Sequence, residues 1–186
     1  QPPQFHPEGD VFVHTRLMLS LLPPDASLPL VLSVLFHDIA KPATYSLDPA
    51  EGRIRFNGHE KVGAEMTESI LRRLRYPNAV IDAVVSGVAH HMQFKDVTKM
   101  RTATLKRFMA REHFDDELEL HRVDCLGSHR LLGNYDYLLS KQEEFAAAPL
   151  LPKWFLQGGD LIAHGCRPGP DLGTLLTEAH DLQLDG

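Results

Sequence analysis

The sequence predicts an all-α fold interrupted by one short hairpin or loop. Apolar residues recur at helical spacing in several segments, and Pro, Gly and Asn separate these segments. The composition is that of a globular chain, with 43% hydrophobic and 24% charged residues among 186. We therefore expect about seven helices in one compact domain with a short C-terminal extension.

The two expected helices before the hairpin each have a clear start or end. Asp10 can cap the first helix, which continues to about Leu22 and is stopped by Pro23. The second, over 28–40, is apolar almost all round, as is typical of a helix buried on every side, and Pro42 ends it.

The period changes between residues 43 and 56. Two short extended stretches flank the turn-forming segment 48–52, which indicates a hairpin or a loose loop. This segment is the best candidate for a lid over a site.

Helices are expected over 57–75 and 77–91, and the second of them ends in His90 and His91. The first carries His59 in its first turn, and its expected inner face is Val62, Met66, Ile70 and Leu74.

Two more helices are expected near 102–111 and 115–126, and the second contains Asp124. From Pro149 onward the composition becomes rich in turn residues around two short apolar segments, which indicates an appended helical pair. We therefore predict one domain over residues 1–148 and an appended segment over 149–186.

Charge, hydropathy and cysteine content exclude several classes of protein. The formal net charge of −6 does not favour a broad nucleic-acid footprint, and no apolar run is long enough to cross a membrane. The two cysteines form no CxxC pair, so neither a disulfide scaffold nor a cysteine-built zinc finger is expected. A reducing cytoplasm is the simplest setting, and the first residues suggest a piece of a longer protein.

The histidines and a few carboxylates are the residues that indicate a functional site. His37 and Asp38 fall in the most apolar expected helix, where burying them costs several kcal/mol unless they are paired or bound to a metal. Donors from separate helices that converge on one point build metal sites in helical bundles. Four other segments each bring a possible ligand: His14, His59, the pair His90 and His91, and Asp124.

The order His, His-Asp, His, His-His, Asp resembles that of the HD-domain phosphohydrolases. Several segments are also similar to the C-terminal half of bacterial CCA-adding tRNA nucleotidyltransferases and poly(A) polymerases. These segments are 9–15, 35–42, 58–65 and 124–129, followed by 159–162 and 168–173.

The resemblance implies an HD-domain helical bundle that holds one or two divalent ions. His14, His37, Asp38 and Asp124 would bind one ion. Asp38 would bridge to a second ion held by His59 with His90 or His91; these neighbours point about 100° apart on a helix and cannot both be equivalent ligands. A His-rich donor set suits Mn, Fe, Co, Ni or Zn better than Mg.

The same resemblance implies a phosphohydrolase whose catalytic residues include His37, Asp38 and His59. Lys41 is added to them because it follows this His-Asp pair near the helix end, where its cation could hold a substrate phosphate. The substrate would be a phosphorylated small molecule or a nucleotide, including 2′,3′-cyclic phosphates, or an RNA 3′ end, and no membrane partner is expected. The remaining histidines are most simply surface or structural residues: His6, His113, His121, His129, His164 and His180.

One departure from the related enzymes affects the expected activity. Their nucleotidyltransferase domain carries Gly-Ser followed by a pair of metal-binding carboxylates. Here the only Gly-Ser is Gly127-Ser128, and the downstream Asp136 is followed at the second position by Leu138, so the pair is missing. We expect no nucleotide addition by this chain. Two alternatives stay open: a non-catalytic RNA-binding or scaffolding HD domain, and a portion of a full nucleotidyltransferase.

Overall fold

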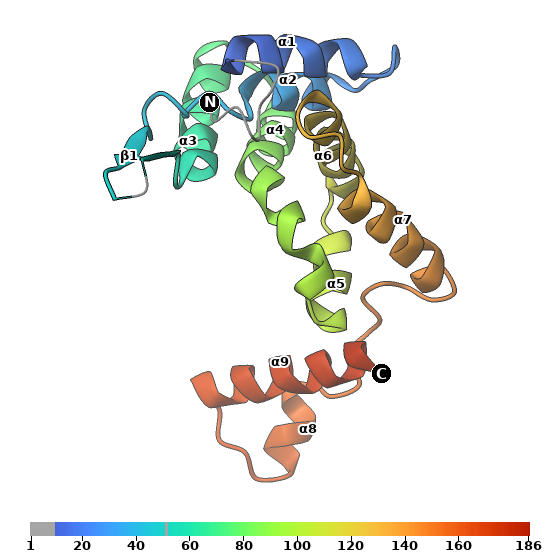
Figure 1. Ribbon diagram of the computed structural model, residues 1–186. Coiled ribbons are helices and arrows are strands. Elements are labelled where there is room, and N and C mark those ends of the chain that lie inside the picture. Colours follow the sequence, from blue (N-terminus) through green and yellow to red (C-terminus); the bar gives the residue numbers. More distant parts are fainter. Residues whose placement is uncertain (1–9, 51) are drawn as a thin grey trace. The chain divides into compact units, whose positions relative to one another are not determined.

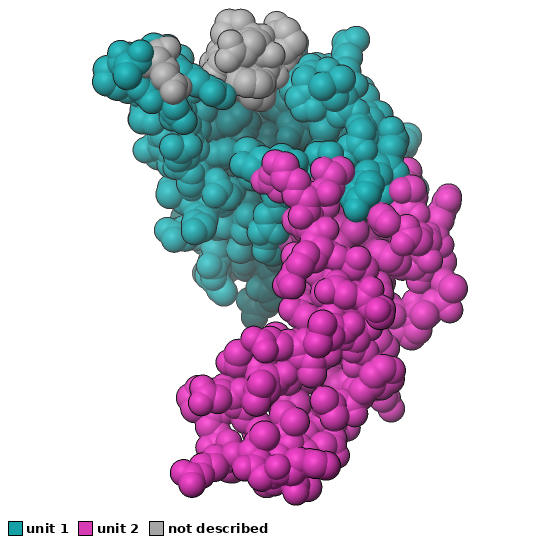
Figure 2. Space-filling model, turned by 60° about the horizontal axis from the view of Figure 1, so that its bottom comes forward, with its two compact units in different colours: residues 1–95, 113–137 teal, residues 96–112, 138–186 magenta. Residues whose placement is uncertain are grey.

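The structure is a computed structural model that describes residues 10–50 and 52–186. The regular secondary structure of these residues is helical apart from one two-stranded antiparallel hairpin, so the predicted all-α fold is confirmed (Figure 1). The chain divides into two compact units (Figure 2): one holds the described residues up to 95 together with 113–137, and the other holds 96–112 and 138–186. The predicted domain boundary after residue 148 stays a prediction. Among the described residues, no helix combines the length and the apolar character needed to span a bilayer.

The first unit contains the helices on which the sequence places the candidate ligands. Asp10 caps the first of them, as expected, because its Oδ1 accepts a hydrogen bond of 2.9 Å from the Val13 N–H. The helices are α1 (Val11–Leu21), α2 (Leu28–Phe36), α3 (His59–Arg73), α4 (Asn78–His90) and α6 (Phe114–Gly127), with the hairpin β1 (Ser46–Asp48) and β2 (Arg53–Arg55) between α2 and α3. The 3-10 helix η1 (His91–Lys99) begins directly after α4.

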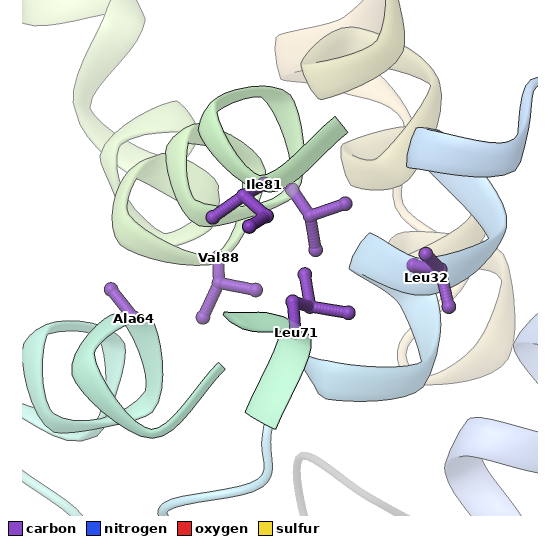
Figure 3. Packing of buried hydrophobic residues seen from close by; sticks show 6 residues of the cluster. Leu32, Ala64, Leu71, Ile81 and Val88 are labelled. Carbon is purple, nitrogen blue, oxygen red and sulfur yellow. The ribbon is translucent and has the colours of Figure 1, made fainter. Parts of the chain in front are cut away.

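Helix α2 contributes to two hydrophobic clusters of this unit. Leu32 packs with residues of α3 and α4, and Figure 3 shows these side chains turned toward one another. Leu30 and Val34 pack with residues of α1 and α6. The expectation that α2 is buried on every side is wrong, because Leu28 and Leu35 are exposed.

Helix α2 is shorter than the sequence predicts. It ends at Phe36 rather than Ala40, and residues 37–44 continue as turns. The Lys41 N–H donates to the Asp38 carbonyl oxygen at 3.0 Å, which is a tighter turn than an α-helix makes. Pro42 has no N–H to donate to the Asp38 carbonyl and restricts Lys41, so the chain could not continue as an α-helix beyond this turn. His37 and Asp38 therefore lie at the end of α2, not inside it.

Helix α3 buries a different face from the expected one. The expected inner residue Leu74 is 57% exposed. The buried face instead carries small residues: a Cβ at Gly63 would lie only 3.3 Å from Val88 Cγ1, so α3 and α4 approach closely there. The buried residues are His59, Gly63, Ala64, Thr67 and Leu71.

The sequence did not predict two elements, η1 and α7 (Gly133–Phe145). In α7 only Leu138 is buried, so the segment has almost no apolar stripe that periodicity could detect. The second unit contains most of α7 together with α5 (Thr102–Met109), α8 (Gly158–Ala163) and α9 (Pro170–Asp185). Helices α8 and α9 are the expected appended pair.

The packing of α2 against α4 gives a stability prediction. A Cβ at Gly87 would lie 2.6 Å from Ser33 Oγ and 3.1 Å from Ser33 Cβ. Gly87→Ala should therefore lower the free energy of unfolding by about 1–3 kcal/mol, measured by urea denaturation. Gly173→Ala is the matched control, because its Cβ would meet nothing within 4 Å inside α9 and should stabilise by about 0.5–1 kcal/mol. Equal effects of the two substitutions would contradict this reading of the α2–α4 contact.

Candidate metal centre

Six of the predicted ligands come together in the first unit. His14 lies on α1, His37 and Asp38 at the end of α2, and His59 is the first residue of α3. His91 follows α4, and Asp124 lies on α6. All of them are buried except Asp124, whose side chain is 28% exposed. Five segments distant in sequence thus deliver nitrogen and oxygen atoms to one place in the bundle.

The first group of donors is formed by His14, His37 and Asp38, each of which offers one ligand atom within 4.8 Å of the others. His37 Nε2 lies 3.1 Å from Asp38 Oδ2. His14 Nε2 lies 3.0 Å from Asp124 Oδ1. A second carboxylate thus lies beside this group of two imidazoles and one carboxylate.

The second group shares Asp38 with the first. Asp38, His59 and His91 also offer ligand atoms within 4.8 Å of one another. His59 Nε2 lies 3.4 Å from Asp38 Oδ1 and 3.1 Å from His91 Nε2. The two oxygens of Asp38 thus face different imidazoles, Oδ2 toward His37 and Oδ1 toward His59.

Backbone carbonyls set the tautomers of the four imidazoles. A carbonyl oxygen can only accept a hydrogen bond, so each Nδ1 carries a proton, and in a neutral ring the lone pair is then on Nε2. His14 is the exception, because its Nε2 also faces an acceptor, Asp124 Oδ1, at 3.0 Å. Histidines that bind metals are held in this way. The Nδ1 partners are the carbonyl oxygens of Gly127 for His14 (3.4 Å), Val34 for His37 (2.9 Å), Phe56 for His59 (2.7 Å) and Val88 for His91 (2.7 Å).

The contacts of the buried Nε2 atoms indicate whether the site is suited to a cation. With both Nδ1 atoms protonated, the Nε2 lone pairs of His59 and His91 face each other at 3.1 Å and repel unless a proton or a metal ion lies between them. His37 Nε2 is also buried, and in the neutral ring its lone pair would face Asp38 Oδ2 at 3.1 Å. The arrangement of these nitrogen atoms is more compatible with a bound divalent ion than with direct contacts between the side chains.

The charge states of the carboxylates also suit a cation. Burial by itself raises the pKa of Asp38, but the His37 charge and hydrogen bond, with His59 and Lys41, hold that pKa well below its usual range. Burial opposes ionisation of Asp124 too, yet its hydrogen bond with His14 and the His37 charge keep the Asp124 pKa low. Both side chains are therefore anionic at neutral pH.

Two of the imidazoles have shifted pKa values in opposite directions. Burial lowers the pKa of His37, but the charge and hydrogen bond of Asp38 outweigh burial and raise this pKa to about 9. Burial, with the nearby His37 charge, lowers the pKa of His91 to about 4. At neutral pH the His91 ring is therefore neutral and has a lone pair to offer to a cation, whereas the His37 ring is protonated and would first have to release a proton.

A cavity of about 340 Å³ opens next to the two groups. Asp38, His59 and His91 are among the residues that line it. The segment expected as a lid lines it with three residues of β2 and with Phe56, which follows that strand. Within the hairpin, Ser46 pairs with Arg55 and Asp48 with Arg53.

Lys41 also lines the cavity but is already engaged. Its Nζ lies 2.6 Å from Asp38 Oδ2 and 5.7 Å from the centre of the Phe56 ring, and the residue is only 7% exposed. The ammonium thus offsets the charge of Asp38 at the edge of the cavity.

His90 does not join the donor groups. Its Nδ1 lies 3.1 Å from Glu117 Oε1, which also accepts a hydrogen bond of 2.7 Å from Ser86 Oγ. Glu117 is 1% exposed and was not singled out from the sequence. One signal could have identified it: Glu117 lies seven residues before Asp124 on α6, and two helical turns place both residues on nearly the same face.

The other histidines fall in different environments. His121 and His180 are buried and stack on Phe94 and Trp154. His129 lines the cavity beside Asp124. His6 lies outside the described residues.

His121 gives a prediction for the pH dependence of stability. Burial lowers its pKa from 6.5 to about 4, so the unfolded chain binds a proton at this ring before the folded chain does. The free energy of unfolding should fall as the pH decreases from about 6.5 toward 4, with up to about 3 kcal/mol from this ring. His121→Gln should flatten that dependence in urea denaturation with EDTA present, whereas the exposed His164→Gln should not. An unchanged slope in His121→Gln would disprove the assignment.

Comparisons with known proteins agree with this geometry. The family model described as the HD domain matches residues 11–126, a range that includes all six clustered residues. No solved structure matches significantly.

Three curated relatives cover most of the chain. The CC-adding tRNA nucleotidyltransferase of Thermus thermophilus is 34% identical over 88% of this chain and 38% of its own length. The A-adding tRNA nucleotidyltransferase of Deinococcus radiodurans is 36% identical over 90% of this chain and 41% of its own. The multifunctional CCA protein of Halorhodospira halophila is 30% identical over 96% of this chain and 43% of its own. The chain thus spans about two fifths of the length of these relatives. Because the family model covers more than half of the sequence, the chain belongs to the HD domain family.

Proposed function

We propose that this chain is a divalent-metal-dependent phosphohydrolase that acts on phosphomonoesters or phosphodiesters of nucleotides, including 2′,3′-cyclic phosphates. The observation that carries the proposal is the arrangement of four buried imidazoles, each with Nδ1 on a backbone carbonyl, around a carboxylate shared by two donor groups. Such a donor set is costly to bury without a cation.

The two donor groups define which residues would hold the metal. His14, His37, Asp38 and Asp124 would hold one ion, and Asp38, His59 and His91 would hold a second. A bound divalent ion supplies Lewis acidity toward a phosphate ester and a source of hydroxide near neutral pH. The mixture of imidazoles and carboxylates suits Mn, Fe, Co, Ni or Zn, with Mg the least suited.

The cavity walls would bind the rest of the substrate. A volume of about 340 Å³ is within the range of small-ligand sites. The hairpin brings the positive charge of Arg53 and Arg55 to the cavity, which favours an anionic phosphate. Arg55 shares its charge with Asp48 at 3.2 Å, and the charge of Lys41 is offset by Asp38. The Phe56 ring adds an apolar surface on which a base could stack.

A second candidate function comes from the relatives, whose names describe enzymes of tRNA. The chain would then bind an RNA 3′ end, as a substrate or as a non-catalytic scaffold. A gel shift with tRNA that weakens with salt would support this alternative. The net charge of −6 argues against tight binding by this chain alone.

Metal analysis and turnover test the proposal together. Purified protein should contain one or two divalent ions per chain, and EDTA should remove them. With added Mn²⁺ or Ni²⁺ the protein should hydrolyse p-nitrophenyl phosphate or adenosine 2′,3′-cyclic phosphate. Bound metal without turnover of either compound would favour the scaffold, and absence of bound metal under all these conditions would exclude both donor groups as metal sites.

A further inference from the structure

His129 occupies a place on the cavity wall that the metal chemistry does not use. It follows α6 and lines the cavity together with Asp124 and Ser128. It belongs to neither donor group. Its ring is therefore placed to contact a ligand in the cavity, beside the carboxylate of Asp124.

The tautomer of His129 is the reverse of that of the four clustered imidazoles. The Leu131 backbone N–H donates a hydrogen bond of 3.0 Å to His129 Nδ1. Because Nδ1 is the acceptor, the ring carries its proton on Nε2. The ring therefore offers an N–H donor at the atom where the neutral rings of His59 and His91 offer a lone pair, so it is suited to bind a ligand oxygen rather than a metal ion.

The turn that carries His129 is held in place from both sides. Ser128 Oγ donates to the Asp124 carbonyl oxygen at 2.7 Å, and the Arg130 N–H donates to the Cys125 carbonyl oxygen at 2.7 Å. Arg130 has φ of 60°, in the left-handed region that residues with a side chain seldom adopt. Such strain persists only where the surroundings impose it. The imidazole is thus presented from an ordered turn at the end of the helix that bears Asp124.

We propose that His129 is a substrate-binding residue that donates a hydrogen bond from Nε2 to an oxygen of the phosphate-bearing substrate. This inference rests on the proposed function, because it concerns the same cavity. A phosphate ester has only acceptor oxygens facing such a donor. Since the bond would form on binding and persist through the reaction, it contributes to affinity more than to the chemical step.

Steady-state kinetics with saturating Mn²⁺ and p-nitrophenyl phosphate provide the test. His129→Ala should raise KM about tenfold, as expected for the loss of one hydrogen bond to a charged group, with kcat within about twofold of wild type. His129→Gln should return KM to within about threefold of wild type, because its amide N–H can replace Nε2–H. His164→Ala is the matched control: its Nδ1 lies 2.9 Å from the Asp160 carbonyl oxygen in the second unit, and KM should not change.

Equilibrium binding of adenosine monophosphate to the Mn²⁺-loaded protein separates the two proposals. A wild-type protein that binds the nucleotide but hydrolyses nothing overturns the phosphohydrolase proposal. In that case a tenfold higher dissociation constant for the nucleotide in His129→Ala would still support the role of His129. Unchanged affinity and KM in His129→Ala, or no recovery in His129→Gln, overturns that role. If the wild type neither binds nor hydrolyses the nucleotide, both proposals are overturned.

Discussion

Replacing Asp38 with asparagine is expected to remove bound metal and to lower phosphohydrolase activity about a thousandfold, equivalent to roughly 4 kcal/mol of barrier. The reason is that Asp38 is the one residue shared by the two donor groups. One of its oxygens faces His37 at 3.1 Å and the other faces His59 at 3.4 Å. Asparagine keeps the shape but removes the negative charge from the centre of the site. Metal content by mass spectrometry and turnover of p-nitrophenyl phosphate measure the two losses.

The same substitution has a cost in stability that must be measured separately. Asp38 offsets the buried charge of Lys41, whose Nζ lies 2.6 Å away. Breaking a buried ion pair on one side costs about 3–5 kcal/mol. Thermal unfolding therefore accompanies the metal analysis, and Asp124→Asn serves as a second variant because its side chain is 28% exposed and costs less to change.

Asp82→Asn is the matched control for both variants. Asp82 is an exposed carboxylate on α4 and belongs to neither donor group. It should keep wild-type metal content, turnover and melting temperature. A folded Asp38→Asn protein with full metal content and turnover would refute the assignment of this centre.

The neighbouring residues His91 and His90 should respond in opposite ways to replacement by alanine. His91→Ala removes a donor from the second group, so about one metal ion per chain should be lost and turnover should fall about 10²- to 10³-fold. His90→Ala leaves both groups intact, so metal content should be unchanged and turnover should stay within about threefold. Metal analysis and kinetics on the two variants side by side make the comparison.

The two variants should also differ in stability, and here His90→Ala is expected to show the loss. His90→Ala removes the imidazole that contacts buried Glu117 at 3.1 Å, and leaving that carboxylate poorly satisfied costs about 1–3 kcal/mol. The melting temperature of His90→Ala should therefore drop although its activity persists. Loss of metal in His90→Ala with retention in His91→Ala would reverse the assignment.

Much of the fold and of the candidate site could be predicted from the sequence. The cap at Asp10, the hairpin between α2 and α3 and the appended helical pair follow from local signals of capping, turn chemistry and periodicity. The candidate donors could be chosen because ionisable groups in apolar helices stand out by their chemistry. Helix α7 could not be found in this way, because it buries little apolar surface.

The predictions about helix faces and helix ends were wrong where tertiary packing, and not the local sequence, selects one of several possible structures. Helix α3 was predicted with the wrong inner face, and one residue of error rotates a helix by about 100°. The small side chains of Gly63 and Ala64 determine that face by letting α4 approach closely. The end of α2 was also misplaced, because the turn before Pro42 replaces the last predicted helical turn.

By itself, the sequence determined the all-α class, the order of the donors along the chain and the family to which that order belongs, since all three depend on residue types and spacing. Only the tertiary structure decided that His91 rather than His90 faces His59, that Glu117 holds His90, and that His129 lines the cavity. These outcomes depend on which helix packs against which, and on the carbonyl or N–H group that each ring nitrogen meets. Contacts between residues separated by tens of positions carry that information, and no local pattern of residues does.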